Sequence, residues 1–180
     1  MTVLVVGGAG SGKSAYAEKI LCKLSEYENR IYIATMHPFG VEAEERIARH
    51  REQRAGRGFH TFECYVNLES LSLPPDCAVL LEDIGNLCAN ELYDPEGSGD
   101  GAADAVLRGV RRLQAQCGTL VIVSNEAGAG GRDYEGDTLR YLRVLGEVNR
   151  RLAALADSVC EVVCGIPVYY NALQTHCSNG

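Results

Sequence analysis

A glycine-rich stretch close to the amino terminus carries residues suited to holding phosphate. Gly7, Gly12, Lys13 and Ser14 fit the pattern G-x-x-x-x-G-K-[ST]. Because glycine has no Cβ, such a loop turns sharply and brings its N–H groups close to a polyphosphate. Lys13 would neutralise the β- and γ-phosphates, and the Ser14 hydroxyl would hold Mg²⁺. The stretch therefore predicts a nucleoside triphosphate site, against the simpler reading of a turn that links a strand to a helix.

Acidic and amide side chains come directly after two apolar runs further along the chain. Glu82 and Asp83 follow the first run, and Asn125 and Glu126 follow the second. Enzymes with a phosphate loop place a carboxylate that helps to hold Mg²⁺ at the end of a buried strand. We therefore expect Glu82 or Asp83 to serve Mg²⁺, with a solvated acidic pair as the alternative. For Asn125 and Glu126, a role as a turn cap is as good an interpretation as a functional one.

One histidine stands in a strongly charged segment, residues 41–54 (VEAEERIARHREQR). By its surroundings alone, His50 is a solvated side chain on an exposed helix. The neighbouring Arg51 and Arg54 would suit a ligand that bears phosphate, or would simply keep the helix soluble. Spacing does not decide between these readings, and His37 and His60 are weaker candidates.

The hydropathy pattern alternates between strands and helices for most of the chain. Short apolar runs predict strands, and apolar residues at helical spacing predict helices. We expect strands at 3–6, 31–35, 60–64, 77–81, 119–124, 159–164 and 166–170, and helices at 13–25, 41–54, 65–71, 84–93, 102–117 and 137–156. This order predicts an α/β fold with a mostly parallel sheet, helices on both faces and antiparallel strands possible at one edge. Residues 1–180 are expected to form a single domain.

Composition narrows the class of protein. The chain has 180 residues, 46% of them apolar, and a net charge of −7, so we expect no nucleic-acid partner. No apolar run is long enough to span a membrane, and the short amino-terminal run leads straight into the glycine-rich loop, which argues against a signal peptide. None of the eight cysteines forms a C-x-x-C pair. Free buried thiols in a reducing cytosol are the simplest interpretation, and disulfides are the less favoured one.

Several stretches, taken in order, resemble the bifunctional adenosylcobinamide kinase / adenosylcobinamide-phosphate guanylyltransferase family of cobalamin biosynthesis. The phosphate loop itself is generic, whereas the helix pattern RIxxHRxxR and the strand-end SNE, in this order and spacing, are typical of the family. The matching stretches are GGAGSGKS at 7–14, YIAT at 32–35, ERIARHREQR at 45–54, TFE at 61–63, LLEDIGNLCANELY at 80–93, VIVSNE at 121–126, LGEVNRRLAALAD at 145–157 and VVCGIPVY at 162–169. The chain departs from the family pattern at 127–136, which is glycine-rich and lacks a proline that many members carry.

The resemblance implies two reactions and a set of residues. The first reaction phosphorylates adenosylcobinamide with ATP or GTP. The second transfers GMP from GTP to adenosylcobinamide phosphate through a GMP–histidine intermediate, and the matching histidine is His50. Lys13 would join His50 in catalysis, while Ser14 and Glu82 would hold Mg²⁺. The expected nucleotide contacts are Gly7, Gly8, Ala9, Gly10, Ser11, Gly12, Lys13, Ser14, Ala34, Thr35, Met36, Arg51, Glu52, Gln53, Arg54, Glu63 and Glu82. Family members are commonly homotrimers with sites between subunits, which implies the same for this chain, and we expect a cytoplasmic location.

Two other functions remain compatible with the residues. Another small-molecule kinase would need Lys13 and a carboxylate for Mg²⁺, but no nucleophilic histidine. A nucleotide-gated binding module would bind GTP with negligible turnover. The guanylyltransferase reading differs from both, because it predicts that His50→Ala keeps nucleotide binding and abolishes covalent transfer of GMP.

Overall fold

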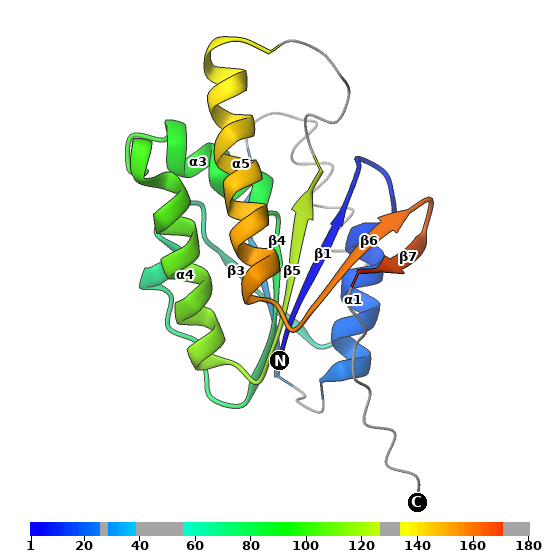
Figure 1. Cartoon of the computed structure of the whole chain (residues 1–180). Coiled ribbons are helices and arrows are strands. Elements are labelled where there is room, and N and C mark those ends of the chain that lie inside the picture. Colours follow the sequence, from blue (N-terminus) through cyan, green and yellow to red (C-terminus); the bar gives the residue numbers. More distant parts are fainter. Residues whose placement is uncertain (26–28, 39–55, 127–133, 171–180) are drawn as a thin grey trace, which may run out of the picture.

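The computed structural model describes residues 1–25, 29–38, 56–126 and 134–170 (Figure 1). The helix expected at 41–54 lies outside the described residues, together with most of the glycine-rich stretch at 127–136 and the carboxyl-terminal tail. The rest of the chain folds as one α/β unit, in which helices and strands alternate as the sequence predicts.

A seven-stranded sheet forms the middle layer, with the order β3-β2-β4-β5-β1-β6-β7. All neighbouring strands run parallel except β7, which pairs antiparallel with β6 at one edge. The prediction of a mostly parallel sheet with an antiparallel edge is therefore confirmed. The strands are β1 (Thr2–Gly7), β2 (Asn29–Ala34), β3 (Phe59–Glu63), β4 (Cys77–Glu82), β5 (Thr119–Asn125), β6 (Ser158–Val163) and β7 (Ile166–Tyr169).

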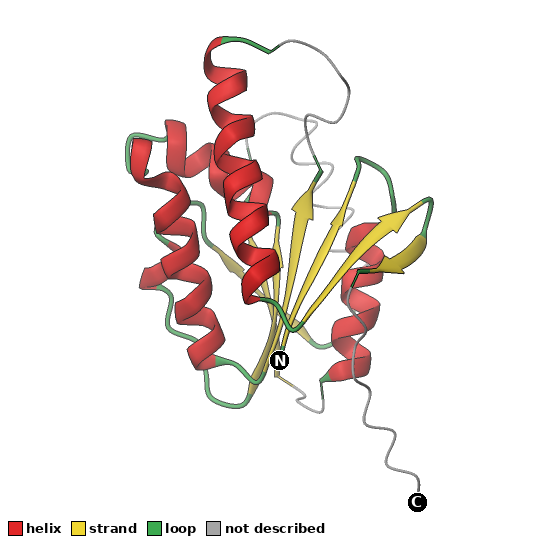
Figure 2. Cartoon of the chain, in the orientation of Figure 1, coloured by secondary structure: helices red, strands yellow, loops and turns green. Residues whose placement is uncertain are grey.

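Helices cover both faces of this sheet (Figures 1 and 2). Helix α1 (Lys13–Leu24) packs on one face, and α3 (Ile84–Tyr93), α4 (Ala102–Gln116) and α5 (Gly136–Leu155) pack on the other. Two short 3₁₀ helices, η1 (Leu68–Ser70) and η2 (Gly99–Gly101), lie in the connections.

The helix expected at 65–71 is wrong in extent, because only the three residues of η1 are helical there. Asn67 precedes η1 with a φ of 52°, a left-handed conformation that interrupts a right-handed helix. Its amide donates to the Glu91 carboxylate at 2.7 Å, which holds the chain in this turn. Leu68 then points inward and is only 1% exposed.

Two apolar cores lie on opposite faces of the sheet. In β1, Val3 and Val5 pack in the core beneath α1, whereas Leu4 packs in the core beneath α3, α4 and α5. Side chains alternate along a strand, so a continuous apolar run is needed where both faces are covered. The cysteines in the described part are free thiols, as predicted, and Cys88 is fully buried.

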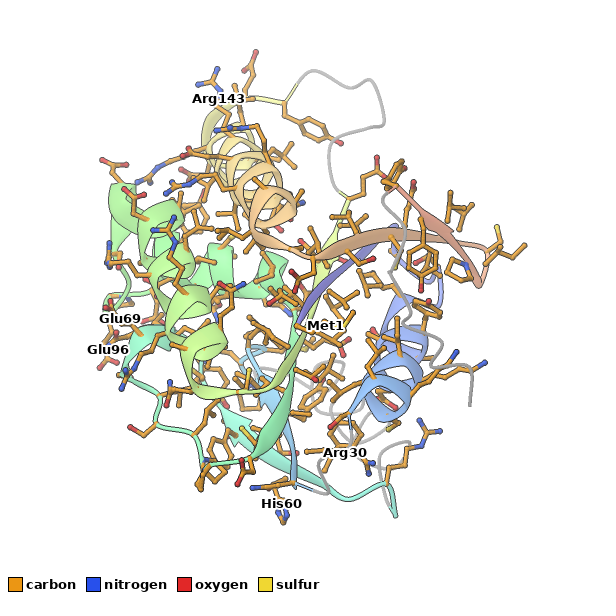
Figure 3. All side chains as sticks on the ribbon, turned by 60° about the horizontal axis from the view of Figure 1, so that its bottom comes forward. Met1, Arg30, His60, Glu69, Glu96 and Arg143 are labelled. Carbon is orange, nitrogen blue, oxygen red and sulfur yellow. The ribbon has the colours of Figure 1, made fainter. Side chains whose placement is uncertain are left out.

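The parallel strands all end on the same side of the sheet, and we call this side the carboxyl edge. In Figure 1 the carboxyl edge lies at the top. The described residues that directly follow β1, β2 and β4 lie along this carboxyl edge, and so does Asn125 at the end of β5. Figure 3 brings the opposite edge forward and labels Arg30 and His60 there, near the residues where β2 and β3 begin. His60 is exposed and remote from the glycine-rich loop.

Candidate active site

The phosphate loop connects β1 to α1, and two of its glycines, Gly7 and Gly12, are required by close packing and by backbone conformation respectively. A Cβ on Gly7 would lie 2.8 Å from the backbone oxygen of Val162 in β6. Gly12 has a φ of 91°, which side chains rarely tolerate. The turn between β6 and β7 supports the loop, because the Gly165 amide donates to the Ser11 carbonyl at 2.8 Å. The loop is thus braced from β6 and β7 in a fixed shape.

Lys13 and Ser14 open helix α1, where the amide groups of the first turn have no partner within the helix. Lys13 is only 8% exposed, and its ammonium donates to the Gly8 carbonyl at 3.1 Å, across the loop. Amide donors, a helix dipole and a lysine thus point to the same small space, an arrangement that binds anions.

Glu82, the last residue of β4, reaches the phosphate loop. Its carboxylate accepts a hydrogen bond from the Ser14 hydroxyl, and the residue is only 7% exposed. Strand β4 is separated from β1 by β5 alone, so the end of β4 lies within reach of the start of α1. The structure therefore brings Lys13, Ser14 and Glu82 together, as the sequence predicted.

Asp83 has a different task from its neighbour. One oxygen of its carboxylate caps helix α3 by accepting from the amides of Gly85 at 2.5 Å and Asn86 at 3.3 Å. The other oxygen accepts from the Asn125 side chain at 2.7 Å. The sequence left Glu82 and Asp83 as alternatives for Mg²⁺, and this geometry favours Glu82, because the Asp83 carboxylate is engaged within the protein.

The donor set at this position fits Mg²⁺. The Ser14 hydroxyl and the Glu82 carboxylate are hard oxygen ligands, the kind that Mg²⁺ prefers, and both lie beside the loop that would present phosphate oxygens. The described residues contain no group of three or more His, Cys, Asp or Glu able to hold a metal. A nucleotide-bound Mg²⁺ takes one or two protein ligands, and phosphates and water complete its shell.

The last residues of β2 and β3 lie on the same carboxyl edge of the sheet as Glu82. Ala34 pairs in register with Glu82 on one side and with Glu63 on the other, so the three lie in one row across the sheet. Glu63 is exposed and accepts from the Tyr65 hydroxyl at 2.9 Å. Thr35, by contrast, is fully buried, and its side chain contacts the backbone of Asp83. Its expected contact with the nucleotide stays a prediction, as does that of the half-buried Met36.

Other predicted residues lie outside the described part of the chain: His50, Arg51, Glu52, Gln53 and Arg54. Their roles rest on the sequence alone. His37, which lies shortly before that segment in the sequence, makes contacts with two described residues. The His37 ring stacks on Tyr65 with 4.1 Å between ring centroids, and its Nε2 lies 3.0 Å from the Asp94 carboxylate.

Sequence reasoning missed several residues that position this edge. Asn149 of α5 donates to the Asn125 carbonyl at 3.1 Å and accepts from the Ser124 hydroxyl at 2.6 Å. Tyr141, about two turns earlier on α5, is half-buried near Asp83, and this burial together with the negative carboxylate raises the pKa of its hydroxyl to about 12. A phenol with such a pKa remains a neutral donor at physiological pH. The only signal in the sequence was an amphipathic helix, which does not reveal these partners.

The chain matches the model of the family described as cobinamide kinase / cobinamide phosphate guanyltransferase over residues 3–170. It is 37% identical to the bifunctional adenosylcobalamin biosynthesis protein CobU of Salmonella typhimurium, over 93% of this chain and 98% of that protein. It is 34% identical to the protein of the same name from Escherichia coli, over the same shares of the two chains. The bifunctional adenosylcobalamin biosynthesis protein CobP of Pseudomonas aeruginosa is 31% identical, over 93% of this chain and 96% of its own length.

One solved structure shows a more distant likeness. The ATPase domain of G40P matches with a TM-score of 0.49 and 13% identity, over 89% of this chain and 68% of that domain. A likeness at this level says nothing about activity. The family model and the curated relatives both span nearly the whole chain, and they agree with the resemblance seen in its motifs. The chain therefore belongs to the cobinamide kinase / cobinamide phosphate guanyltransferase family of adenosylcobalamin biosynthesis enzymes.

Proposed function

We propose that this protein phosphorylates the aminopropanol hydroxyl of adenosylcobinamide and then transfers GMP from GTP to the phosphate it has made. The observation that carries the proposal is the convergence of Lys13, Ser14 and Glu82 beside a braced phosphate loop. The description of the family and the names of its relatives support the same pair of reactions.

In this proposal the loop and the start of α1 bind the triphosphate. Backbone amides of residues 7–14 and the Lys13 ammonium receive the β- and γ-phosphates. Ser14 and Glu82 hold Mg²⁺, which when bound offsets the charge that develops on the departing phosphate groups. Further nucleotide contacts are proposed for Ala34, Met36, Glu63 and Arg51–Arg54, on the strength of the family resemblance.

Phosphorylation consists of attack by the substrate hydroxyl oxygen on the γ-phosphorus of ATP or GTP. The new P–O bond forms as the bond to the β-phosphate oxygen breaks, and the nucleoside diphosphate leaves. Lys13 stays in contact with both phosphates through this step, so it stabilises charge where it accumulates.

Transfer of GMP is proposed to run through His50. A neutral imidazole nitrogen attacks the α-phosphorus of GTP, the bond to the β-phosphate oxygen breaks, and pyrophosphate leaves. An oxygen of adenosylcobinamide phosphate then attacks the same phosphorus. The P–N bond breaks, and the products are adenosylcobinamide-GDP and a free histidine.

The test is an assay of both products by mass spectrometry. Wild-type protein with Mg²⁺, GTP and adenosylcobinamide should give adenosylcobinamide phosphate and adenosylcobinamide-GDP. Lys13→Ala should lose both products, whereas His50→Ala should still form the phosphate and lose the GDP adduct. His60→Ala is the matched control, because this exposed histidine lies at the opposite edge of the sheet and should change neither product. Absence of both products from wild-type protein would refute the proposal.

Assembly and location are part of the proposal as well. We infer a homotrimer, because family resemblance implies sites between subunits, and light scattering on purified protein would measure its mass. A cytoplasmic location is proposed because GTP and ATP are available there. The free thiols of the described cysteines agree with a reducing compartment. No helix in the described part of the chain is long and apolar enough to span a membrane.

A further inference from the structure

Thr35 makes contacts that its sequence position alone does not explain. The residue follows β2, is fully buried, and lies beside the end of β4. Its hydroxyl donates to the backbone oxygen of Asp83 at 2.8 Å and accepts from the backbone amide of Asp83 at 2.7 Å. The Thr35 amide donates in turn to the carbonyl of Glu82 at 3.0 Å.

These three hydrogen bonds hold the backbone on both sides of the Glu82–Asp83 junction. The Thr35 carbonyl is itself fixed, because it accepts from the side chain of Asn90 on α3 at 2.8 Å. The Asp83 carboxylate is held from the other side by the start of α3 and by Asn125 of β5. The position of Glu82 is thereby set from β2, α3 and β5 together.

Glu82 is the residue of this junction whose carboxylate meets the phosphate loop, at Ser14. A carboxylate that shares a metal with a hydroxyl must keep its direction closely, and its supporting hydrogen bonds decide this. The only proton of the Thr35 hydroxyl is given to the Asp83 carbonyl, so this group has no donor left for a phosphate.

We propose that Thr35 is a positioning residue, whose buried hydroxyl clamps the Asp83 backbone and so aims the Glu82 carboxylate at Ser14 and the nucleotide-bound metal. The proposal rests on the proposed role of Ser14 and Glu82 as metal ligands. It assigns Thr35 an action through Glu82, where the sequence suggested a direct contact with the nucleotide.

Three variants separate this role from a general effect on folding. Thr35→Val replaces the hydroxyl by a methyl group of similar size, and Thr35→Ser keeps the hydroxyl while it removes the methyl group. Thr2→Val is the matched control: Thr2 is a buried threonine whose hydroxyl accepts from Gln114 at 3.0 Å, at the start of β1 and thus at the opposite edge of the sheet. Thr35→Ala removes the same hydroxyl without an added methyl group and takes the place of Thr35→Val if that variant does not fold.

The measurement is binding of Mn²⁺, followed by electron paramagnetic resonance, to protein saturated with a non-hydrolysable GTP analogue. Binding of the analogue without metal and thermal unfolding are recorded beside it. Thr35→Val should weaken Mn²⁺ binding about 10- to 100-fold, the usual effect of losing a group that orients a metal ligand. Affinity for the analogue without metal should stay within about twofold. Thr35→Ser and Thr2→Val should bind Mn²⁺ as the wild type does, and the kcat of both reactions should follow the Mn²⁺ affinities.

Two results would overturn this inference while the proposed function stands. One is unchanged Mn²⁺ binding in Thr35→Val, and the other is an equal loss of analogue binding without metal, which would indicate a direct nucleotide contact. A separate variant tests the proposed metal site itself. If Glu82 is not a metal ligand, Glu82→Gln should bind Mn²⁺ as tightly as the wild type does.

Discussion

At the scale of single residues, two adjacent carboxylates at the end of β4 make different contacts. Glu82 contacts Ser14 at the phosphate loop, and Asp83 caps α3 while it accepts from Asn125. The sequence offered both as metal ligands, because each follows the same apolar run. Their places in the fold distinguish them: Glu82 is the last residue of β4, whereas Asp83 lies past the strand and is the N-cap residue of α3.

This division predicts different outcomes for two isosteric changes. Glu82→Gln should lower the kcat of both reactions by about a hundredfold or more, because a metal that stabilises developing charge contributes several kcal/mol. Asp83→Asn should cost less than about tenfold, since asparagine caps a helix as well as aspartate does. Steady-state kinetics over a Mg²⁺ titration measures both effects. A larger loss in Asp83→Asn than in Glu82→Gln would show that the assignment is reversed.

At the scale of elements, the packing of α4 on η1 depends on a glycine. A Cβ on Gly109 of α4 would lie 2.6 Å from the Cβ of Leu68, a distance that real side chains do not reach. Gly146 of α5 is exposed and would meet nothing within 4 Å. A side chain at position 109 would therefore clash with Leu68, whereas a side chain at position 146 would have free space.

We therefore expect opposite signs for the same substitution. Gly109→Ala should lower the free energy of unfolding by about 1–3 kcal/mol, as overpacking does in a filled core. Gly146→Ala should raise it by up to about 1 kcal/mol, because alanine is the better helix former. Urea denaturation of each variant measures these changes. Equal effects in the two helices would mean that Leu68 does not press on Gly109 as described.

Most elements could be predicted from the sequence, because their signals are local. The apolar run of β4 and the helix at 84–93 are both found where expected, the helix with the same bounds. The failure at 65–71 has a distant cause, since the left-handed turn at Asn67 is stabilised by Glu91, which lies 24 residues further on. The clamp from Thr35 to Asp83 spans 48 residues and is equally invisible to local patterns.

At the scale of the whole molecule, the order of the strands decides which loops meet. Alternating strands and helices predicted a parallel sheet, but not that β5 separates β1 from β4. That order puts Glu82 within reach of Ser14. The phosphate loop could be named from its motif, whereas its brace by the β6–β7 turn at Gly165 could not, because no local pattern records a contact across more than 150 residues.

The buried thiols give the molecule a characteristic response to alkaline pH. Burial, with smaller contributions from Asp83 and Glu91, raises the pKa of Cys88 from 9.0 to about 12. Between these values the folded chain keeps a proton that the unfolded chain loses, so the free energy of unfolding falls as pH rises. The stability from this group is fully present below pH 9 and is lost as pH approaches 12.

Denaturation in urea at a series of pH values from 7 to 10.5 measures this effect, within the limit of about 1.4 kcal/mol per pH unit for one thiol. Wild-type protein should lose stability above about pH 9, and Cys88→Ala should lose it less steeply. Identical slopes for the two proteins would show that Cys88 does not titrate on unfolding in this range.

The proposal of a nucleotidyl transfer through His50 is tested most directly by a covalent label. Purified protein is incubated with Mg²⁺ and GTP labelled at the α-phosphate, and the protein is then digested and mapped. We expect label on His50 that is lost in acid and kept in base, as a phosphoramidate is, with no label in His50→Ala and full label in His60→Ala. Protein that binds GTP at the phosphate loop yet takes up no label, or takes it up equally in His50→Ala, would contradict the proposed transfer.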